Sequence, residues 1–145
     1  MSEEIWKDVV GFEGLYMVSN LGAILALKRK VVSPNGHRYA RERILRQANS
    51  NGYSLVMVCK NGERVNRNVH RMVADAFLLN PENKPCVNHK NGVRNDNRVE
   101  NLEWCTYSEN ELHSHRCLGK VPLTGPSHGQ YKHGRYCKTT SLVGP

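Results

Sequence analysis

Glycine residues punctuate the first part of the chain and divide it into short apolar segments. Gly11, Gly14 and Gly22 interleave with aromatic and aliphatic residues over positions 5–27. Closely spaced glycines favour tight turns, so this pattern predicts short strands joined by turns. The Ser-Pro-Asn-Gly sequence at 33–36 is a further strong turn signal, and it lies inside a basic stretch.

The apolar periodicity changes from that of strands to that of a helix near residue 69. Residues 53–59 suit a strand, Asn61-Gly62 is a hairpin dipeptide, and residues 64–69 alternate as a return strand would. Apolar residues then recur at spacings of three and four, which places them on one face of a short helix. They are Val69, Met72, Val73, Ala76 and Phe77. Asn80-Pro81 ends the helix because a residue before proline is pushed out of the helical region.

A second strand–loop–strand pattern, followed by a helix, begins at Cys86. We predict a strand over residues 86–89, an asparagine-rich loop over 90–101, and a strand over 102–106. The pairs and triplets of Asn, Asp and Gly in the loop have turn chemistry. A helix then runs from Tyr107 to about Arg116, and Thr106 with Glu109 fits a helix capping box.

A hairpin of this kind brings the end of its first strand against its helix. Asn88 and His89 would then face Asn110, and His113 would lie one turn further on the same helix face. The sequence therefore predicts that four polar side chains meet at one place.

The charge balance points to a polyanionic partner. The 145 residues include 21 Lys and Arg against 13 Asp and Glu, so the formal net charge is +8, and the pI is about 9.4. Nucleic acid is the usual partner, although a basic protein without such a partner would have the same composition. We expect no membrane partner, because no apolar run approaches the roughly 18 residues of a spanning helix. The acidic N-terminus also lacks the apolar region of a secretory signal.

Cysteine usage indicates a reducing compartment. The chain has five cysteines, an odd number, and no pair has the C-x-x-C spacing. A disulfide framework and a four-cysteine zinc site are therefore not expected, and reduced thiols in a cytosolic protein are.

The stretch that begins at Cys86 contains the residue types that phosphodiester hydrolysis needs. A histidine can take the proton of an attacking water near neutral pH, because its unperturbed pKa is about 6.5. A divalent cation can stabilise the charge gained by the phosphate and the leaving oxygen. Asn88 and Asn110 would offer the side-chain carbonyl oxygens that Mg²⁺ accepts as ligands. Both are neutral, so we expect weak metal binding until the scissile phosphate completes the site.

The order of His89, Asn101 and Asn110 resembles the HNH motif with asparagine in its last position. The wider match resembles the HNH homing endonucleases encoded by phages and introns, and it covers about residues 5–116. Its N-terminal pieces resemble a small DNA-binding module that is often fused to such nucleases. The matching pieces are Trp6-Lys7-Asp8, Gly11-Phe12-Glu13-Gly14-Leu15-Tyr16, Val18-Ser19-Asn20, Val69-His70-Arg71, Val87-Asn88-His89, Asn101-Leu102-Glu103-Trp104 and Ser108-Glu109-Asn110.

The resemblance implies a role for each residue of the motif. His89 would be the general base, and Asn101 would hold the loop so that the His89 ring is oriented. Asn88 and Asn110, with His113 as a further candidate, would bind one divalent metal ion, Mg²⁺ or Mn²⁺. Many relatives carry Asp at the position of Asn88 and His at that of Asn110, which leaves metal affinity and preference open.

Structural roles are the alternatives at each of these positions. His89 would then be a histidine in a turn, Asn101 a residue that only closes the loop, and Asn110 and His113 solvent-facing helix residues. Trp104 is expected to be a core residue and not a base-stacking one, because it lies in a predicted strand.

The basic stretches 28–46 and 60–71 would form the DNA-holding surface. Phosphate contacts by Lys and Arg give affinity without sequence information. A solvated charged face is the alternative, and at positions 70 and 71 so is helix capping and packing. The candidate DNA-binding residues are Lys28, Arg29, Lys30, Arg41, Arg43, Lys60, Arg64, Arg67, His70 and Arg71.

These observations predict an α+β fold. We expect an N-terminal β-rich DNA-binding module with a small antiparallel sheet over residues 1–68. A ββα-metal (His-Me finger) nuclease hairpin would follow over 69–117, and a basic tail containing Gly, Pro and His over 118–145. A short repeat in the tail would be a DNA-backbone arm, a disordered end or a metal-binding tract.

The predicted function is metal-dependent hydrolysis of double-stranded DNA by a monomer or a homodimer. The resemblance implies a phage-type homing or nicking endonuclease that acts in the cytoplasm of a bacterial host. Two alternatives remain: a catalytically silent DNA-binding module, and a phage nuclease component that needs a protein partner.

Overall fold

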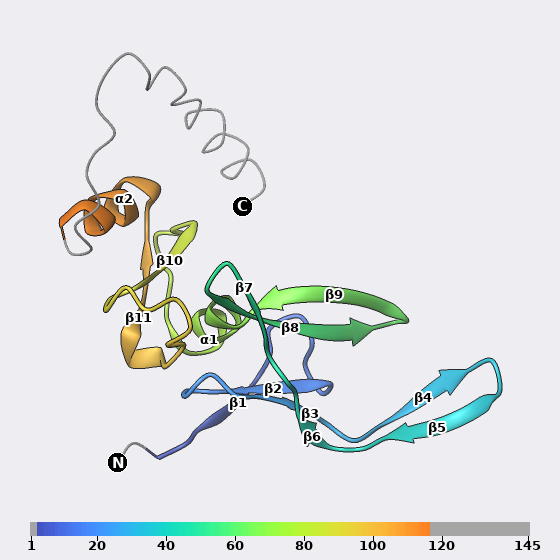
Figure 1. Cartoon of the computed structure of the whole chain (residues 1–145). Helices are drawn as coiled ribbons and strands as arrows, with labels where there is room; N and C mark the ends of the chain where they lie inside the picture. The colour runs from blue at the N-terminus through green and yellow to red at the C-terminus, as the bar shows by residue number, and fades with distance from the viewer. Residues whose placement is uncertain (1–2, 117–145) are drawn as a thin grey trace.

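Short antiparallel strands build most of the molecule, and two helices complete it (Figure 1). The computed structural model describes residues 3–116, so the predicted tail at 118–145 lies outside the described residues. Eleven strands in four antiparallel sheets and two α-helices confirm the expected α+β class for the described part of the chain.

The first sheet is formed by the glycine-punctuated N-terminal segment. Its strands are β1 (Trp6–Asp8), β2 (Tyr16–Ser19), β3 (Ile24–Ala26) and β6 (Arg43–Ile44), in the order β1-β2-β3-β6. Gly22, in the β2–β3 turn, has a φ of +92°, and a Cβ there would lie 2.9 Å from the Cβ of Asn97. The turn therefore packs closely on the loop that follows β10 (Cys86–His89), and glycine is the residue that fits there.

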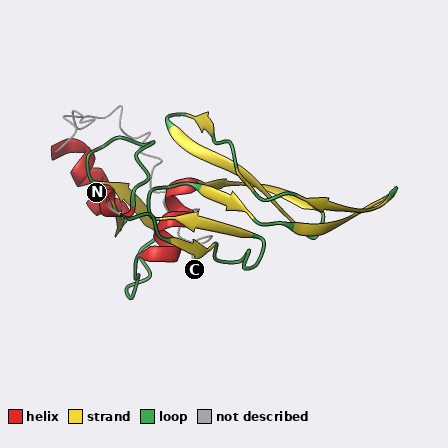
Figure 2. Cartoon of the chain, turned by 90° about the horizontal axis from the view of Figure 1, so that it is seen from below, coloured by secondary structure: helices red, strands yellow, loops and turns green. Residues whose placement is uncertain are grey.

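A two-stranded arm projects from this sheet (Figures 1 and 2). It consists of β4 (Arg29–Ser33) and β5 (Gly36–Ala40), which pair around the predicted Ser-Pro-Asn-Gly turn. The expectation of one small N-terminal sheet is corrected at this point, because the arm and a third sheet pair separately. No residue of the arm is fully buried, so it has no apolar face to pack against the core.

The third sheet leads directly into the first helix. Its strands are β7 (Ala48–Ser50), β8 (Tyr53–Lys60) and β9 (Glu63–Asn68), followed by α1 (Val69–Phe77). Asn61 and Gly62 both have positive φ, as the predicted hairpin turn requires. The predicted change of period at residue 69 is confirmed, and the helix ends at Phe77.

The last sheet is a hairpin that carries the second helix. Strand β10 pairs with β11 (Leu102–Cys105), with a short 3₁₀ turn at Val99–Asn101 between them, and α2 (Tyr107–Arg116) follows. The predicted capping box is present. The backbone N–H of Thr106 donates to the Glu109 carboxylate at 2.7 Å, and the N–H of Glu109 donates to Thr106 Oγ1 at 3.2 Å.

One hydrophobic core joins all of these parts except the arm and α2. Its members come from the N-terminal sheet and its β1–β2 connection, from β8, from α1 and from β11, and α1 lies among them (Figure 1). They are Val9, Phe12, Tyr16, Val18, Ile24, Ala26, Val56, Val58, Val69, Met72, Val73 and Leu102. The core therefore crosses the predicted module boundary between residues 68 and 69. Neither helix of the described chain is long and apolar enough to cross a membrane.

Candidate active site

A pocket of about 120 Å³ lies where the end of β10 meets α2. Four predicted site residues line it together: Asn88, His89, Asn110 and His113. The other lining residues are Tyr53, Val87, Gly92, Arg94 and Ser114. The hairpin thus brings together side chains that are up to 25 positions apart in the sequence (88 to 113).

His89 is buried, with 5% of its surface exposed, and one of its ring nitrogens has a defined partner. His89 Nε2 lies 3.2 Å from Asn97 Oδ1. Because the amide oxygen can only accept, Nε2 carries the proton and Nδ1 keeps a free lone pair. Burial lowers the pKa of His89, against the opposite effects of Asn97 and Asp96. The ring is therefore neutral near pH 7, as a proton acceptor must be.

Asn101 holds the loop, and its side chain bonds to Asn91 and Asp96 and not to the His89 ring in the described part of the chain. Its Nδ2 donates to the Asp96 carbonyl at 2.9 Å and to Asn91 Oδ1 at 3.0 Å, and its Oδ1 accepts the Asn91 N–H at 3.0 Å. The residue that bonds His89 is Asn97, which sequence reasoning missed. The Asn95-Asp96-Asn97 triplet had indicated only a turn, and its spacing from His89 carries no periodic signal.

Asn88 is tied to the neighbouring strand. It is buried, and its Nδ2 donates to Glu103 Oε1 at 2.8 Å, from the position directly opposite in the β10–β11 register. This bond directs the nitrogen end of the amide to Glu103 and leaves Oδ1 as the acceptor. Glu103 is a second residue that sequence analysis did not assign to the site.

The donor set fits a hard cation better than a transition metal. Among residues 3–116, no three His, Cys, Asp or Glu side chains converge on a position that could hold a metal ion. The candidate ligands are neutral amide oxygens of Asn88 and Asn110. Such oxygens suit Mg²⁺, which keeps several waters or phosphate oxygens, and they do not suit zinc.

His113 uses one ring nitrogen to join α2 to the loop. Its Nε2 donates to the Lys90 carbonyl oxygen at 3.0 Å. Since a carbonyl can only accept, Nε2 is protonated, and Nδ1 alone is left for any metal contact.

His70, on α1, packs against His89. The ring centroids of His70 and His89 are 5.1 Å apart, and Tyr53 lies 5.2 Å from His70 and 6.0 Å from His89. Only 6% of His70 is exposed, and burial lowers its pKa to about 3. A buried, neutral imidazole does not fit the phosphate contact expected of His70, and it fits the packing alternative.

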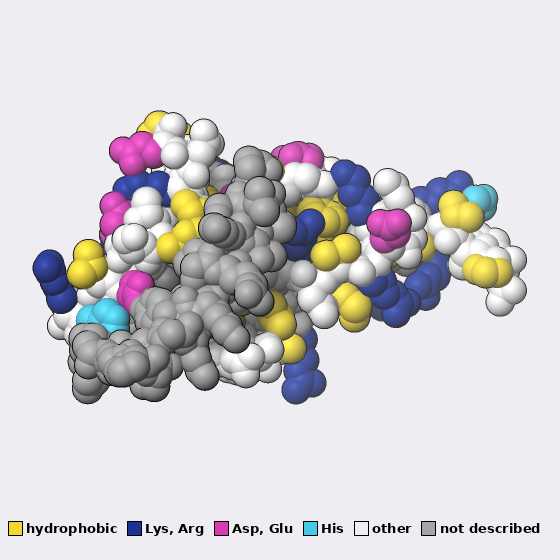
Figure 3. All heavy atoms as spheres, turned by 90° about the horizontal axis from the view of Figure 1, so that it is seen from above, with side chains coloured by type: hydrophobic (Ala, Val, Ile, Leu, Met, Phe, Trp, Pro, Cys, Tyr) yellow, Lys and Arg dark blue, Asp and Glu magenta, His cyan; other side chains and the backbone are white. Residues whose placement is uncertain are grey.

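Half of the predicted DNA-binding residues lie on the arm or on the neighbouring β8–β9 hairpin, namely Arg29, Lys30, Lys60, Arg64 and Arg67. Between the arm and this hairpin is a groove of about 690 Å³ whose lining includes Arg29, Arg38, Arg41, Arg43 and Arg64. Figure 3 shows Lys and Arg side chains gathered along the projecting part of the molecule. Lys28 and Lys30 are exposed on this part as well.

Several of the predicted basic residues also have structural contacts, among them Arg29 and Lys60. Arg29 Nη2 donates to the Tyr16 hydroxyl at 2.7 Å, and the guanidinium lies 4.7 Å from the centre of that ring. Lys60 Nζ donates to the Gly11 carbonyl at 2.7 Å. These contacts tie both side chains to the N-terminal part of the fold.

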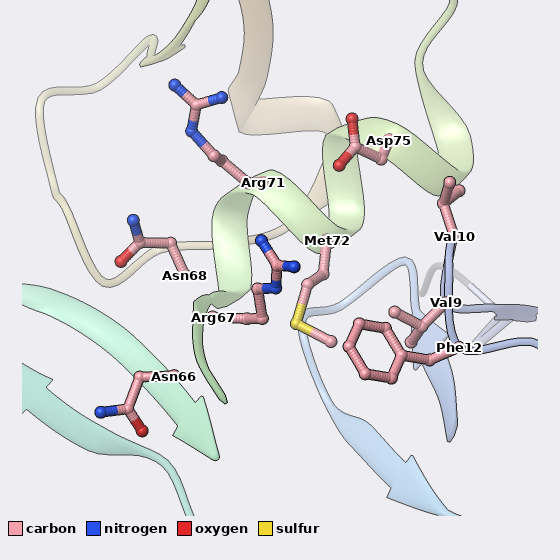
Figure 4. A pocket seen from close by; sticks show the side chains of 9 residues that line it. All are labelled: Val9, Val10, Phe12, Asn66, Arg67, Asn68, Arg71, Met72 and Asp75. Carbon is pink, nitrogen blue, oxygen red and sulfur yellow. The ribbon is translucent and has the colours of Figure 1, made fainter. Parts of the chain in front are cut away.

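Arg67 and Arg71 line a separate pocket of about 280 Å³ (Figure 4). Arg67 lies beside Met72, and Arg71 and Asp75 project from α1. Arg71 Nη2 donates to the Pro85 carbonyl at 2.8 Å. This pocket contains none of the residues that line the pocket around His89.

A strand–loop–strand hairpin backed by a helix, with a buried histidine at the end of its first strand, is the arrangement of the ββα nucleases. Comparisons with known proteins agree. Residues 4–59 match the NUMOD4 motif, and residues 67–112 match the HNH endonuclease model. The chain therefore contains a NUMOD4 segment followed by a segment of the HNH endonuclease family.

Several HNH endonucleases are similar to this chain. It is 42% identical over 116 residues to the uncharacterized HNH endonuclease L247 of Acanthamoeba polyphaga mimivirus, covering 77% of this chain and 26% of that protein. It is 32% identical over 105 residues to the DNA endonuclease I-HmuI of Bacillus phage SP01, covering 72% of this chain and 54% of that protein. The chain thus spans from about a quarter to about half of these relatives.

A solved structure has the same fold. The HNH homing endonuclease I-HmuI, in a structure of DNA binding and cleavage, superposes with a TM-score of 0.57 at 24% identity. The match covers 91% of this chain and 68% of that chain.

Proposed function

We propose that this protein is a metal-dependent DNA endonuclease in which His89 is the general base. The observation that carries the proposal is the His89–Asn97 hydrogen bond, which leaves Nδ1 of a neutral imidazole as the proton acceptor beside two amide oxygens. The DNA endonuclease I-HmuI, which is similar over 105 residues, supports DNA as the substrate.

Each polar residue of the hairpin and of α2 has a separate role in the proposed hydrolysis. Nδ1 of His89 takes the proton of a water that attacks the phosphorus, and Asn97 holds the ring in the required tautomer. Asn101 keeps the loop closed beneath the ring. His113 fastens α2 to the loop and so keeps Asn110 opposite Asn88.

Asn88 and Asn110 would hold a single divalent ion, Mg²⁺ or Mn²⁺. When bound, the ion supplies positive charge that stabilises the phosphate and the leaving oxygen. The two amides contribute no negative charge, so the DNA phosphate is needed to complete the site, and the affinity for metal without DNA is low.

The arginine-lined groove and the arm would hold double-stranded DNA through its phosphates. With one active site per chain, the proposed product from a monomer is a nick, and a homodimer would cut both strands. A phage-type homing or nicking endonuclease that acts inside a host cell is the corresponding biological role, and the division into modules at 1–68 and 69–117 belongs to the same proposal.

The first experiment is a plasmid-relaxation assay with Mg²⁺, Mn²⁺ or EDTA, run beside His89→Ala. Supercoiled DNA should become open circles only with metal and only when His89 is present. His89→Ala should bind DNA with little change, because one neutral side chain contributes little to a many-phosphate contact. Cleavage by His89→Ala at the native rate would show that another group is the base.

Two other outcomes would redirect the proposal. A linear product would indicate a double-strand cutter acting as a dimer. A DNA complex that shifts on a gel without cleavage under any cation would favour the silent binding module, and cleavage that appears only with an added protein would favour the partner-dependent component.

A further inference from the structure

Arg94 is the one residue with a permanent positive charge among those that line the pocket around His89. The rest of the lining consists of apolar, amide, hydroxyl and histidine side chains and one glycine. Arg94 is exposed and lines the same pocket as His89, whose pKa its positive charge acts to lower.

The N-terminal part of the chain holds this arginine in place. Arg94 Nη1 donates to the Asn51 carbonyl at 3.0 Å, and the guanidinium lies 5.1 Å from the centre of the Tyr53 ring. Between them, Gly52 has a φ of +86°, and a Cβ there would lie 3.3 Å from Arg94 Cδ. The β7–β8 turn thus packs against the Arg94 side chain, which is about forty positions further along the sequence (52 to 94).

These contacts leave most of the N–H donors of the guanidinium available to bind a ligand. A guanidinium has five N–H donors, and the structure of residues 3–116 shows a hydrogen bond for one of them. No ion pair involves Arg94 in that part of the chain, whereas Arg98, four positions later, is paired with both Asp96 and Glu100. The positive charge of Arg94 is therefore not paired with a carboxylate in the described part of the chain, and most of its N–H donors are available to a ligand.

We propose that Arg94 binds the phosphate that is cleaved, through a non-bridging oxygen. This inference rests on the proposed function and names a residue that contacts its substrate. The amide ligands bring no charge of their own, so a fixed guanidinium opposite them adds to the stabilisation of negative charge developing on the phosphate. Arginine suits this task because its planar fork binds two oxygens, and because a preorganised donor needs no rearrangement during the reaction.

Three variants test the proposal: Arg94→Gln, Arg94→Lys and, as a matched control from the same loop, Arg98→Gln. Binding of a fluorescein-labelled DNA duplex is measured by anisotropy in EDTA over a range of salt concentrations. Nicking of supercoiled plasmid is measured with Mg²⁺ or Mn²⁺, and thermal denaturation of each variant verifies folding.

Arg94→Gln should reduce the slope of log K against log salt by about 0.9, the amount that one phosphate contact contributes. It should also slow nicking about 100-fold, as the loss of one preorganised donor does in other enzymes. Arg94→Lys should keep most of the slope and still lose cleavage, because an ammonium lacks the planar fork. Arg98→Gln should match the wild type in both measurements.

An unchanged salt slope in a folded Arg94→Gln protein would overturn the proposal, whatever happens to cleavage. If that variant does not fold, Arg94→Lys decides, since nicking at the native rate would exclude a role for the guanidinium fork. The DNA-binding measurement needs no cleavage, so it stays informative if the wild-type protein proves inactive. An inactive wild-type protein would count against the proposed function and not against the Arg94 contact.

Discussion

Hydrogen bonds to amide side chains define the positions of the polar residues around His89. Asn97 selects the tautomer of the imidazole, and Asn101 closes the loop with three bonds. Glu103 fixes the orientation of the Asn88 amide, because a carboxylate can accept a hydrogen bond only from the nitrogen end of that amide. A metal ligand that is oriented by a second residue binds more tightly than one that rotates freely.

Glu103→Ala should therefore weaken metal binding by about tenfold, the lower end of the loss seen when such partners are removed. Glu103→Gln should lose less, because its amide oxygen can still accept from Asn88 Nδ2. Binding is measured as depletion of the free Mn²⁺ signal in electron paramagnetic resonance, with duplex DNA present and in the His89→Ala background to prevent cleavage.

Glu100→Gln is the matched control, since it removes one exposed carboxylate that is paired with Arg98. An equal affinity for Mn²⁺ in Glu103→Ala and in the Glu100→Gln control would mean that Asn88 does not need Glu103, or that it is not a ligand.

At the scale of elements, the helix and hairpin ends position the candidate site and the DNA surface. The capping box at Thr106 starts α2 directly after β11, which sets where Asn110 and His113 meet the hairpin. The arm and the β8–β9 hairpin place arginines on both sides of one groove.

Thr106→Ala should destabilise the protein by about 1 kcal/mol, because the first turn of α2 loses the oxygen that accepts the Glu109 N–H. Thr106→Ser keeps that oxygen and should retain most of the stability. Urea denaturation followed by circular dichroism gives both values, and equal stability of the Ala and Ser variants would contradict a capping role.

Arg64→Gln should weaken DNA binding and reduce its salt dependence, since Arg64 is exposed in the groove beside the arm. The slope of log K against log salt should fall by about 0.9 if the residue makes one phosphate contact. Anisotropy measurements on a labelled duplex provide the slope. If it stays at the wild-type value, DNA lies on another surface of the molecule.

At the scale of the whole molecule, the two matched family segments depend on each other. The hydrophobic core runs through both, Gly22 packs against Asn97, and Val99 donates its N–H to the Asn20 carbonyl at 2.8 Å. His70 is buried and packs against Tyr53 of the first segment and His89 of the second. A change in the N-terminal part is therefore expected to reach the pocket around His89.

Burial of His70 should make the folded protein less stable in mild acid. Its pKa falls from 6.5 to about 3 on folding, so the unfolded chain binds a proton that the folded chain excludes. This contribution to stability is fully present above about pH 6.5 and is lost as the pH falls towards 3. At pH 5 the loss amounts to about 2 kcal/mol, and burial of His89 acts in the same direction.

Thermal denaturation between pH 7.5 and 5 tests this expectation, with His70→Phe as the comparison. The phenyl ring keeps the aromatic packing against Tyr53 and His89 but cannot titrate. The variant should lose much less stability than the wild type on acidification, and parallel losses in the two proteins would place the titrating group elsewhere.

The sequence by itself determined the elements whose signals are local. The helix from Val69, the strand that ends at His89, the Asn61-Gly62 turn and the capping box at Thr106 all depend on residues within a few positions of one another. Hairpin geometry then sufficed to predict that Asn88, His89, Asn110 and His113 would meet, because short connections leave few arrangements.

Only the tertiary structure decided which partners these residues take. Asn97 bonds His89 from within a turn, Arg94 rests on a turn of the N-terminal part, and His70 faces inward from the first turn of α1. None of these contacts follows from a repeat or a fixed spacing. Each depends on how the separate elements pack around one core, and packing is a property of side chains that are far apart in the sequence.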